Sequence, residues 1–369
     1  MATNQEIKFI SAGSGVPKEV LRFLSSGDEK TYLQEDIYAF SDTNFFKLRI
    51  NDGVPTKLLR YRRLTSPVLR ESSYDAYELL NSSAREAALF IFRSLSTAGT
   101  VRKKRRQFLA RDLLLNVDTI YDDEWKTPLY HAVEVEYFRK DSSKNDTGRT
   151  VQKILDWFGV KPYELLPYSN IHMINMLRSS KQFRHVLSQG AGRLILIDGG
   201  SATGKSTVKK ILVEKYSFGY APRDTTRERR PDDLITHDYN FVSRVEFNRR
   251  ALLGEYIEFR DFLFDMSYGL PWSGFIEPLS RGSNMMALIN LGNGYFTKKL
   301  FPNATLVLLY ADVQVIRERL EVRGTMTNEQ IEERIENNRL ARTYLDAYDR
   351  AIDTSKFSPQ EVADQIVGC

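Results

Sequence analysis

A chain of 369 residues, 42% apolar and 27% charged, has the composition of a globular protein and is long enough for two or three domains. Its net charge of +5 is too small to imply a nucleic-acid partner by itself, but it suits anionic substrates. The single cysteine, Cys369, excludes a disulfide within the chain and a cysteine-based zinc site. No apolar run approaches 18 residues and no signal-peptide pattern is present, so we expect a cytoplasmic protein with no membrane partner.

Five strand-like segments in the N-terminal half each carry two charged residues spaced two positions apart. Side chains alternate between the two faces of a strand, so each pair projects to one side. One such pair alone is common on the solvated face of an antiparallel sheet. The pairs are Glu6 and Lys8, Lys47 and Arg49, Arg60 and Arg62, Lys103 and Arg105, and Glu134 and Glu136.

Five paired strands in one region favour a closed antiparallel β-barrel with the charges inside. Helical patterns near 18–25 and 84–95 can cover the apolar outer faces. About eight strands enclose room for one small ligand, and buried charges must pair or hold ions and anions. We therefore predict that the lysines and arginines bind a polyphosphate, and that Glu6, Glu134 and Glu136 bind a divalent metal ion such as Mg²⁺ or Mn²⁺.

The order of these segments resembles the CYTH, or triphosphate tunnel metalloenzyme, family, which includes class IV adenylyl cyclases, thiamine triphosphatases and RNA triphosphatases. The resemblance runs from Glu6 to about Arg178 and implies a tunnel domain over residues 1–178 that hydrolyses or cyclises a triphosphate with a metal ion. The family's opening motif, E-x-E-x-K, falls on Asn4, Glu6 and Lys8, so Asn4 replaces one expected carboxylate. The segments that carry the resemblance are EIK, EDIYAF, FKLRI, TKLLRYRR, VRKKRRQF, LLNVDTIYD and AVEVEYF.

The stretch SSKQFRHVLSQGAG, residues 179–192, is predicted to be a linker, and residues 193–369 a second domain. That domain opens with LILIDGGSATGKSTVKKIL, which predicts a strand, a glycine loop and a helix. The loop fits the spacing G-x-x-x-x-G-K-[ST], in which backbone N–H groups surround a phosphate, the lysine reaches the β- and γ-phosphates and the serine holds Mg²⁺. The alternative is a glycine-rich turn that binds nothing. The predicted nucleotide-binding residues are Gly199, Ser201, Ala202, Thr203, Gly204, Lys205, Ser206 and Thr207.

Two groups of arginines follow the P-loop. Arg227, Arg229 and Arg230, with Tyr239, can bind a second phosphate through guanidinium contacts, or they form a solvated charged loop. A later segment, RERLEVRGTMTNEQIEERIENNR, predicts a mobile lid whose arginines neutralise the transferred phosphoryl group. Arginines paired with glutamates on a helix surface are the alternative there. The candidate lid residues are Arg319, Arg323 and Arg334.

Residues 193–367 resemble guanylate kinase, through TTR, DYNFVS, GEYIEF, SYG and RERLEVRG in that order. The resemblance implies that Arg227, Arg230 and Tyr239 bind the acceptor phosphate, that Glu258 faces the acceptor's base and that Tyr268 lies at the phosphate. Arg223 stands where the family has serine and is a further candidate for acceptor binding, and ALINLGNG lacks the family's aspartates. YGLP and LINLG are similar instead to ribose 1,5-bisphosphate phosphokinase.

Together these patterns predict a multidomain protein, an α+β barrel followed by an α/β P-loop kinase with a parallel sheet. The predicted reaction is transfer of the γ-phosphoryl group of ATP, with Mg²⁺, to a nucleoside monophosphate or phosphosugar. A second hypothesis is a kinase and triphosphatase that processes 5′ ends of nucleic acids, but the sequence shows no aromatic-rich basic groove for bases. A third is a kinase regulated by a degenerate polyphosphate-sensing barrel, which Asn4 favours.

Overall fold

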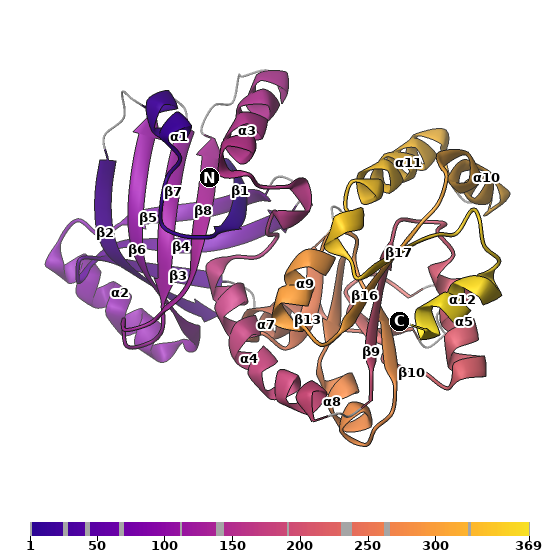
Figure 1. Cartoon of the computed structure of the whole chain (residues 1–369). Helices are drawn as coiled ribbons and strands as arrows, with labels where there is room; N and C mark the ends of the chain where they lie inside the picture. The colour runs from indigo at the N-terminus through magenta and orange to yellow at the C-terminus, as the bar shows by residue number, and fades with distance from the viewer. Residues whose placement is uncertain are drawn as a thin grey trace. The chain divides into compact units, whose positions relative to one another are not determined.

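The computed structural model describes residues 2–24, 29–40, 45–65, 70–110, 113–137, 144–189, 192–229, 238–261, 266–323 and 326–368. The chain divides into two compact units. Unit 1 comprises Met1–Asn175, Arg244–Leu253 and Asp261–Met266, and unit 2 comprises Met176–Ser243, Gly254–Arg260 and Ser267–Cys369. Each unit is built around its own sheets (Figure 1).

Unit 1 is built on eight antiparallel strands whose pairing closes on itself, in the order β1-β5-β4-β3-β2-β6-β7-β8. Closure comes from β1, which pairs with β5 along one edge and with β8 along the other. The strands are β1 (Ala2–Ser11), β2 (Glu29–Phe40), β3 (Phe45–Asn51), β4 (Val54–Thr65), β5 (Arg70–Glu78), β6 (Ser96–Ala110), β7 (Leu113–Tyr121) and β8 (Pro128–Tyr137).

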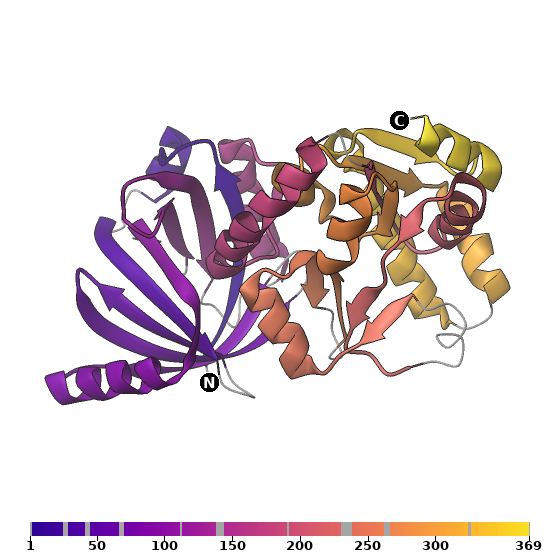
Figure 2. The ribbon, with the colours of Figure 1, turned by 90° about the horizontal axis from the view of Figure 1, so that it is seen from below.

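Helices cover the apolar outer faces of these strands (Figure 2). Helix α1 (Lys18–Phe23) and helix α3 (Lys144–Phe158) pack on β1, β7 and β8, where Phe9 meets the ring of Phe158 at 5.2 Å. Helix α2 (Ser82–Ser94) packs its Ala88 and Phe92 on β2 and β3. The two predicted covering helices near 18–25 and 84–95 are confirmed, and with the outer faces covered, the charged faces of the strands point inward.

Two further segments complete unit 1. The 3₁₀ helix η1 (Pro162–Glu164) leads into the first residues of helix α4 (Asn170–Ser188). Helix α7 (Arg244–Leu253) contributes Leu252 to an apolar cluster with Val101 and Ile120 of the barrel and Ile174 of α4. A segment from the C-terminal half of the sequence is therefore part of the barrel's compact unit.

Unit 2 contains a five-stranded parallel sheet in the order β10-β15-β9-β16-β17. Buried residues of α5 and α12 pack together on it, and the two helices lie side by side in Figure 1. The strands are β9 (Leu194–Gly199), β10 (Gly219–Tyr220), β15 (Met285–Leu288), β16 (Thr305–Tyr310) and β17 (Arg350–Asp353). Besides the later part of α4, the helices in the described residues of unit 2 are α5 (Lys205–Tyr216), α8 (Ser273–Ser280), α9 (Gly294–Leu300), α10 (Val313–Arg323), α11 (Asn328–Arg342), η2 (Leu345–Ala347) and α12 (Pro359–Val367).

A second, four-stranded sheet in unit 2 has the order β12-β11-β14-β13. It carries most of the residues predicted to bind the phosphate acceptor. Its strands are β11 (Arg223–Thr225), β12 (Tyr239–Phe241), β13 (Tyr256–Asp261) and β14 (Ser267–Pro271).

The mixed architecture of antiparallel strands followed by a parallel α/β sheet is confirmed, but the predicted linker 179–192 is wrong for most of its length. Helix α4 continues to Ser188, because apolar residues at helical spacing, such as Phe183, are buried among aromatic rings. Phe183 lies 5.1 Å from the ring of Trp272 and 5.2 Å from that of Phe301. The polar composition of the stretch reflects the exposed side of a helix.

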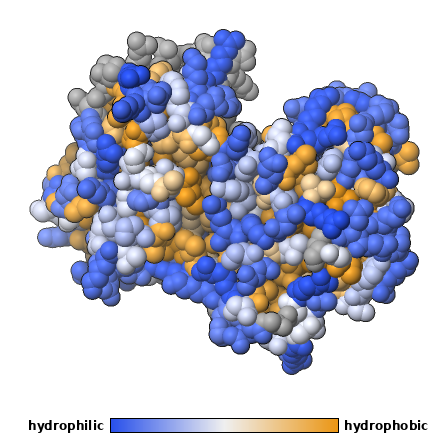
Figure 3. All heavy atoms as spheres, in the orientation of Figure 1, coloured by the Kyte–Doolittle hydropathy of each residue, from blue (hydrophilic) through white to orange (hydrophobic). Residues whose placement is uncertain are grey.

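Polar residues predominate on the face shown in Figure 3, with apolar patches between them. Within the described ranges, no helix combines the length and the apolar character needed to cross a membrane.

Candidate functional site

The P-loop connects β9 to α5 through backbone conformations that favour glycine. Gly199 has φ +150° and Gly204 has φ +88°. A Cβ atom on Gly199 would lie 2.4 Å from the carbonyl oxygen of Leu309, so no other residue fits there. Ala202 also adopts a positive φ, of 62°, which is uncommon for a residue with a side chain. These turns leave the N–H groups of the loop and of the first turn of α5 available for a phosphate.

Lys205, the first residue of α5, points its ammonium group along the P-loop. Its Nζ donates to the carbonyl oxygens of Gly199 at 2.5 Å and Gly200 at 2.6 Å. Ser206 and Thr207 follow it and are exposed. The structure therefore brings together the lysine and the hydroxyl that the motif predicts for phosphate and magnesium.

Two predicted lid arginines contact the P-loop directly. Arg319 of α10 donates to the carbonyl oxygen of Ala202 at 3.1 Å and to that of Thr354 at 3.0 Å. Arg334 of α11 donates to Ser201 Oγ at 2.9 Å. The side chain of Arg323 lies outside the described residues. Two cations from separate helices therefore border the loop that would hold a triphosphate.

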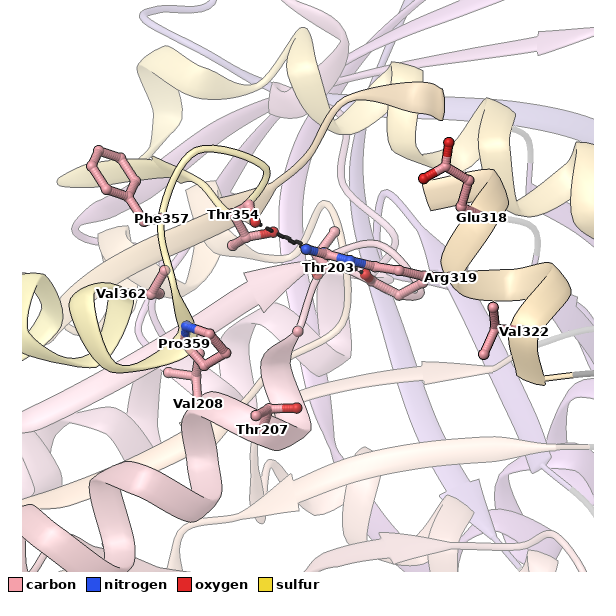
Figure 4. A pocket seen from close by; sticks show the side chains of 12 residues that line it. Thr203, Thr207, Val208, Glu318, Arg319, Val322, Thr354, Phe357, Pro359 and Val362 are labelled. Atoms are coloured by element: carbon pink, nitrogen blue, oxygen red, sulfur yellow. Dashed lines mark hydrogen bonds between the residues drawn. The ribbon is translucent and has the colours of Figure 1, made fainter. Parts of the chain in front are cut away.

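A cavity of about 460 Å³ opens beside the P-loop (Figure 4). Thr207 and Val208 of α5 lie on one side and Arg319 on another, while Pro359 and Val362 come from α12. The walls are mostly apolar, and Arg319 is held by its contacts with Thr354. Mostly apolar walls with a few polar groups are typical of a small-molecule binding site.

The predicted acceptor residues Arg223 and Glu258 form a buried ion pair in the four-stranded sheet. Arg223 Nη2 lies 2.8 Å from Glu258 Oε1. The other oxygen, Glu258 Oε2, accepts from Asn290 Nδ2 at 2.8 Å and Asn293 Nδ2 at 2.5 Å. Glu258 is fully buried. The two asparagines belong to ALINLGNG, the stretch that lacks the aspartates of the guanylate kinase pattern.

Two tyrosines lie next to this ion pair. The rings of Tyr239 and Tyr268 meet edge to face, with centroids 5.8 Å apart. The guanidinium of Arg223 lies 5.7 Å from the ring of Tyr268, and that of Arg227 lies 4.7 Å from the ring of Tyr239. Four predicted acceptor residues thus meet, whereas Arg230 lies outside the described residues.

Asp198, at the end of β9, is a buried residue of this site that sequence reasoning did not assign. It accepts hydrogen bonds from the Tyr348 hydroxyl and, at 2.6 Å, from the Gly199 N–H. Burial raises the pKa of Asp198 to about 6, although these donors and Lys205 oppose the shift. Its place directly before the glycine loop was the only sequence signal.

Charged side chains of the barrel form a continuous network on the inner face. Glu134 lies 2.5 Å from both Lys8 Nζ and Arg105 Nη2. Arg105 also makes two hydrogen bonds to Asp118, at 2.7 and 2.6 Å. Lys103 Nζ lies 3.3 Å from Asp118 Oδ2, the oxygen that also accepts from Arg105 Nη2.

The network continues to β2 and β3 through Asp36. This carboxylate lies 2.9 Å from Arg49, 3.6 Å from Lys47 and 3.7 Å from Lys103. Burial alone would raise the pKa of Asp36, but Arg49, Lys47 and Lys103 hold it well below its usual range. Burial and the neighbouring Arg49 lower the pKa of Lys47 to about 8. Five of the predicted inward-facing cations therefore meet, and each of the three carboxylates in this network, Asp36, Asp118 and Glu134, has at least two cationic neighbours.

The predicted metal set of Glu6, Glu134 and Glu136 is not assembled. Lys8 and Arg105 take both oxygens of Glu134, while Glu136 accepts from Asn116 at 2.9 Å. In the described part of the chain, no three His, Cys, Asp or Glu side chains are grouped to hold a metal ion. The physical reason is that Lys8 pairs directly across from Glu134 in the strand register.

Three other barrel predictions have different outcomes. Arg60 pairs with Asp75 at 2.6 Å and is about one-third exposed, so it lies outside the buried network. The side chains of Arg62 and Asn4 lie outside the described residues. Two carboxylates of the network, Asp36 and Asp118, were not assigned from the sequence. In the strand register, each lies on the same inward face as Lys103 and Arg105 of β6. Alternation along the strands was the signal that could have found them.

A family model matches the second half of the chain. Residues 191–363 match the family model described as guanylate kinase. The guanylate kinase of Nocardia farcinica is 33% identical over 164 residues, which is 44% of this chain and 85% of that protein. The guanylate kinase of Streptococcus thermophilus is also 33% identical over 164 residues, which is 44% of this chain and 78% of that protein. The crystal structure of guanylate kinase from Anaplasma phagocytophilum has 22% identity and a TM-score of 0.38, over 48% of this chain and 84% of that one. Through residues 191–363, the chain belongs to the guanylate kinase family.

Proposed function

We propose that this protein is an ATP-dependent kinase that phosphorylates a phosphate group of a small acceptor, a nucleoside monophosphate or a phosphosugar. The observation that carries the proposal is the convergence of Lys205, Arg319 and Arg334 on the P-loop. Membership of a family of phosphotransferases supports it.

The phosphate chain of ATP would lie in the P-loop, with its base in the cavity beside Arg319 and Pro359. Lys205 would exchange its carbonyl contacts for the β- and γ-phosphates, and Arg334 would stabilise charge on the group in transfer. Magnesium usually keeps several waters and needs few protein ligands besides phosphates. The exposed hydroxyl of Ser206 therefore fits this ion, which would neutralise phosphate charge.

At the acceptor end, Arg227 and Tyr239 would bind the phosphate that reacts. An oxygen of this phosphate attacks the γ-phosphorus of ATP, a new P–O bond forms, and the bond to the β–γ bridging oxygen breaks to release ADP. The protein contributes positioning and charge neutralisation, which are the main sources of catalysis in phosphoryl transfer.

The direct test is a panel of acceptors incubated with purified protein, ATP and Mg²⁺, with ADP formation followed and products identified. The panel contains nucleoside monophosphates, phosphosugars and 5′-phosphorylated oligonucleotides. We expect ADP to form only when a small acceptor is present. Phosphorylation of the oligonucleotides alone would instead support processing of nucleic-acid ends.

For the barrel, we propose a binding chamber for a triphosphate or polyphosphate, in line with its resemblance to the triphosphate tunnel family. Its support is the set of inward cations, among which Lys47 is held in place by Asp36. A ligand with several negative charges can exchange with the internal carboxylates for these cations. The proposed binding needs no metal ion, because both oxygens of Glu134 are held by Lys8 and Arg105.

Replacing Lys47 by methionine should weaken tripolyphosphate binding about 10- to 100-fold, because it deletes one charge-assisted contact. Asp36 keeps Arg49 and Lys103, so the barrel should stay folded. Lys47 loses its proton as the pH rises through about 8, so wild-type affinity should fall there. The Lys47→Met protein should not show this fall in affinity. Titration calorimetry in a Lys205→Ala background, where the P-loop is weakened, measures both effects.

Lys57→Met is the matched control, because Lys57 lies on the neighbouring strand and is 41% exposed. Equal affinity losses for the two variants would contradict binding inside the barrel. Phosphate release, measured in the same samples, shows whether the bound polyphosphate is also hydrolysed.

A second candidate function, a kinase regulated by the barrel, is favoured by the contacts of α4 within unit 1. Asn170, its first residue, lies 3.3 Å from Lys8 Nζ and 3.4 Å from Glu134 Oε1 in the charged network. Asn175 then donates to the carbonyl oxygens of Ala98 at 2.9 Å and of Leu252, in α7, at 2.6 Å. Helix α7 connects β12, which carries Tyr239, with β13, which carries Glu258.

If the barrel regulates the kinase, tripolyphosphate should change the KM for the acceptor, and Asn175→Ala should remove that change. The variant leaves the ligand-facing cations intact, so its affinity for tripolyphosphate should stay within about twofold of wild type. Steady-state kinetics and calorimetry on the same preparations measure the two quantities. An undiminished effect in Asn175→Ala would rule out this route.

A further inference from the structure

The polar cluster around Glu258 offers donors to the acceptor site. Glu258 Oε1 is paired with Arg223, and Oε2 accepts from both Asn290 and Asn293. A carboxylate has about four acceptor positions in all, and three are filled. Guanine presents two adjacent N–H donor groups on its pairing edge and needs two acceptors at one place. This carboxylate does not provide them.

Arg223, in contrast, has donors to spare. Its side chain is 9% exposed, and its Nε is buried with no hydrogen-bond partner among the described residues. The described contacts use one of its five N–H groups, the bond to Glu258. A buried N–H without an acceptor is energetically costly, so a bound molecule that supplies acceptor atoms to this guanidinium is stabilised.

The tyrosine pair separates two guanidinium groups. Arg227 lies 4.7 Å from the ring of Tyr239, and Arg223 lies 5.7 Å from the ring of Tyr268. The two arginines are four residues apart, which is at most about 13 Å between their Cα atoms in an extended chain. A small molecule with an anionic group at each end can reach both cations.

We propose that the preferred acceptor carries a second anionic group, a phosphate or a carboxylate, and that Arg223 binds it while Arg227 binds the reacting phosphate. This inference rests on the proposed kinase function. Glu258 is then the counter-ion that orients Arg223, and Asn290 and Asn293 are positioning residues that hold Glu258. An anionic group is favoured as the partner of Arg223, because hydrogen bonds with charged partners are about twice as strong as those between neutral groups.

The test compares acceptors in pairs that differ in the second anion. Nucleoside 3′,5′-bisphosphates are compared with 5′-monophosphates, GMP included, and sugar bisphosphates and phosphorylated sugar acids with sugar monophosphates. Wild-type protein should use one class of doubly anionic acceptor with kcat/KM at least tenfold above its singly anionic counterpart. The bisphosphate and sugar-acid arms distinguish phosphate from carboxylate. Arg223→Ser, which restores the family's serine, should reduce the preference to about twofold or less.

The matched control is Arg281→Ser, because Arg281 is a 74% exposed arginine of unit 2. It should keep the wild-type preference. A preference for GMP, or a preference for doubly anionic acceptors that survives Arg223→Ser, would overturn the inference and leave the kinase proposal standing. Failure of every acceptor to yield ADP would overturn the kinase proposal itself.

The role of Glu258 has its own test. In Glu258→Gln the shape is kept and the charge is lost, so Arg223 should still bind the second anion and the preference should remain. If Glu258 instead binds the base of a nucleotide acceptor, Glu258→Gln should lower kcat/KM for the preferred acceptor, whereas Arg223→Ser should not.

For the positioning residues, Asn290→Ala with Asn293→Ala should raise the KM for the doubly anionic acceptor and leave the KM for ATP unchanged. When the two asparagine substitutions are combined with Arg223→Ser, they should not raise the KM for the doubly anionic acceptor any further. Full additivity would show a merely structural role.

Discussion

Lys205→Ala should lower kcat of the kinase reaction by about 10²-fold or more without changing the stability of the chain. The ammonium group contacts the carbonyl oxygens of Gly199 and Gly200, at the mouth of the loop that would surround the β- and γ-phosphates. Removing it deletes a charge that stabilises the transition state, whereas alanine is an excellent helix former at the start of α5. Initial rates at saturating ATP and acceptor, together with a melting curve, measure the two effects.

Lys210→Ala on the same helix is the matched control. Lys210 is 71% exposed and lies 3.9 Å from Glu214, a surface pair that is expected to contribute under about 1 kcal/mol. Its kcat should equal that of the wild type. A Lys205→Ala protein with wild-type turnover would show that the P-loop of this chain does not bind the reacting nucleotide.

The largest stability effect is expected for Asp118→Ala in the barrel, which should lower the free energy of unfolding of unit 1 by about 3–5 kcal/mol. Asp118 is fully buried and is bonded to Arg105 at 2.7 and 2.6 Å and to Lys103 at 3.3 Å. Without it, Lys103 loses a close counter-ion, and Arg105 keeps only Glu134. Removing one partner of a buried ion pair is costly, because it leaves cationic charge in the interior with less compensation.

A chain with two compact units need not unfold in one step, so the measurement must report on unit 1 alone. Hydrogen exchange of β6 and β7, followed by mass spectrometry, meets that requirement. Asp123→Ala is the control, because Asp123 is 63% exposed and pairs with Arg102 on the surface at 3.0 Å. If the amides of β6 and β7 are equally protected from exchange in the Asp118→Ala and Asp123→Ala proteins, the buried charge network inside the barrel is contradicted.

The extent to which the sequence predicted the structure follows from how local each signal is. The P-loop was predictable because its spacing and its strand and helix are adjacent in the chain, and Gly199 and Gly204 have the expected backbone conformations. The inward charges of the barrel were predictable from alternation along single strands. The mixed architecture followed from both.

Interactions between distant segments could not be read from the sequence. Glu258 meets Asn290 and Asn293 only after β13 and α9 are folded, and the same is true of Asp198 and Tyr348. The metal prediction failed for a related reason. The prediction grouped the carboxylates that share one face of the strands. It did not include the strand register, which places Lys8 opposite Glu134. The linker prediction failed because polar composition does not distinguish the exposed side of a helix from a loop.

Transfer of a phosphoryl group to the acceptor can be followed directly by ³¹P NMR of the products formed from ATP, Mg²⁺ and the acceptor that gives the fastest ADP release. If the protein is a kinase that acts on a phosphate group, a new diphosphate signal should appear from the acceptor, in amounts equal to ADP, and it should be absent with Lys205→Ala protein. ADP accompanied only by inorganic phosphate, with the acceptor unchanged, would contradict the kinase proposal.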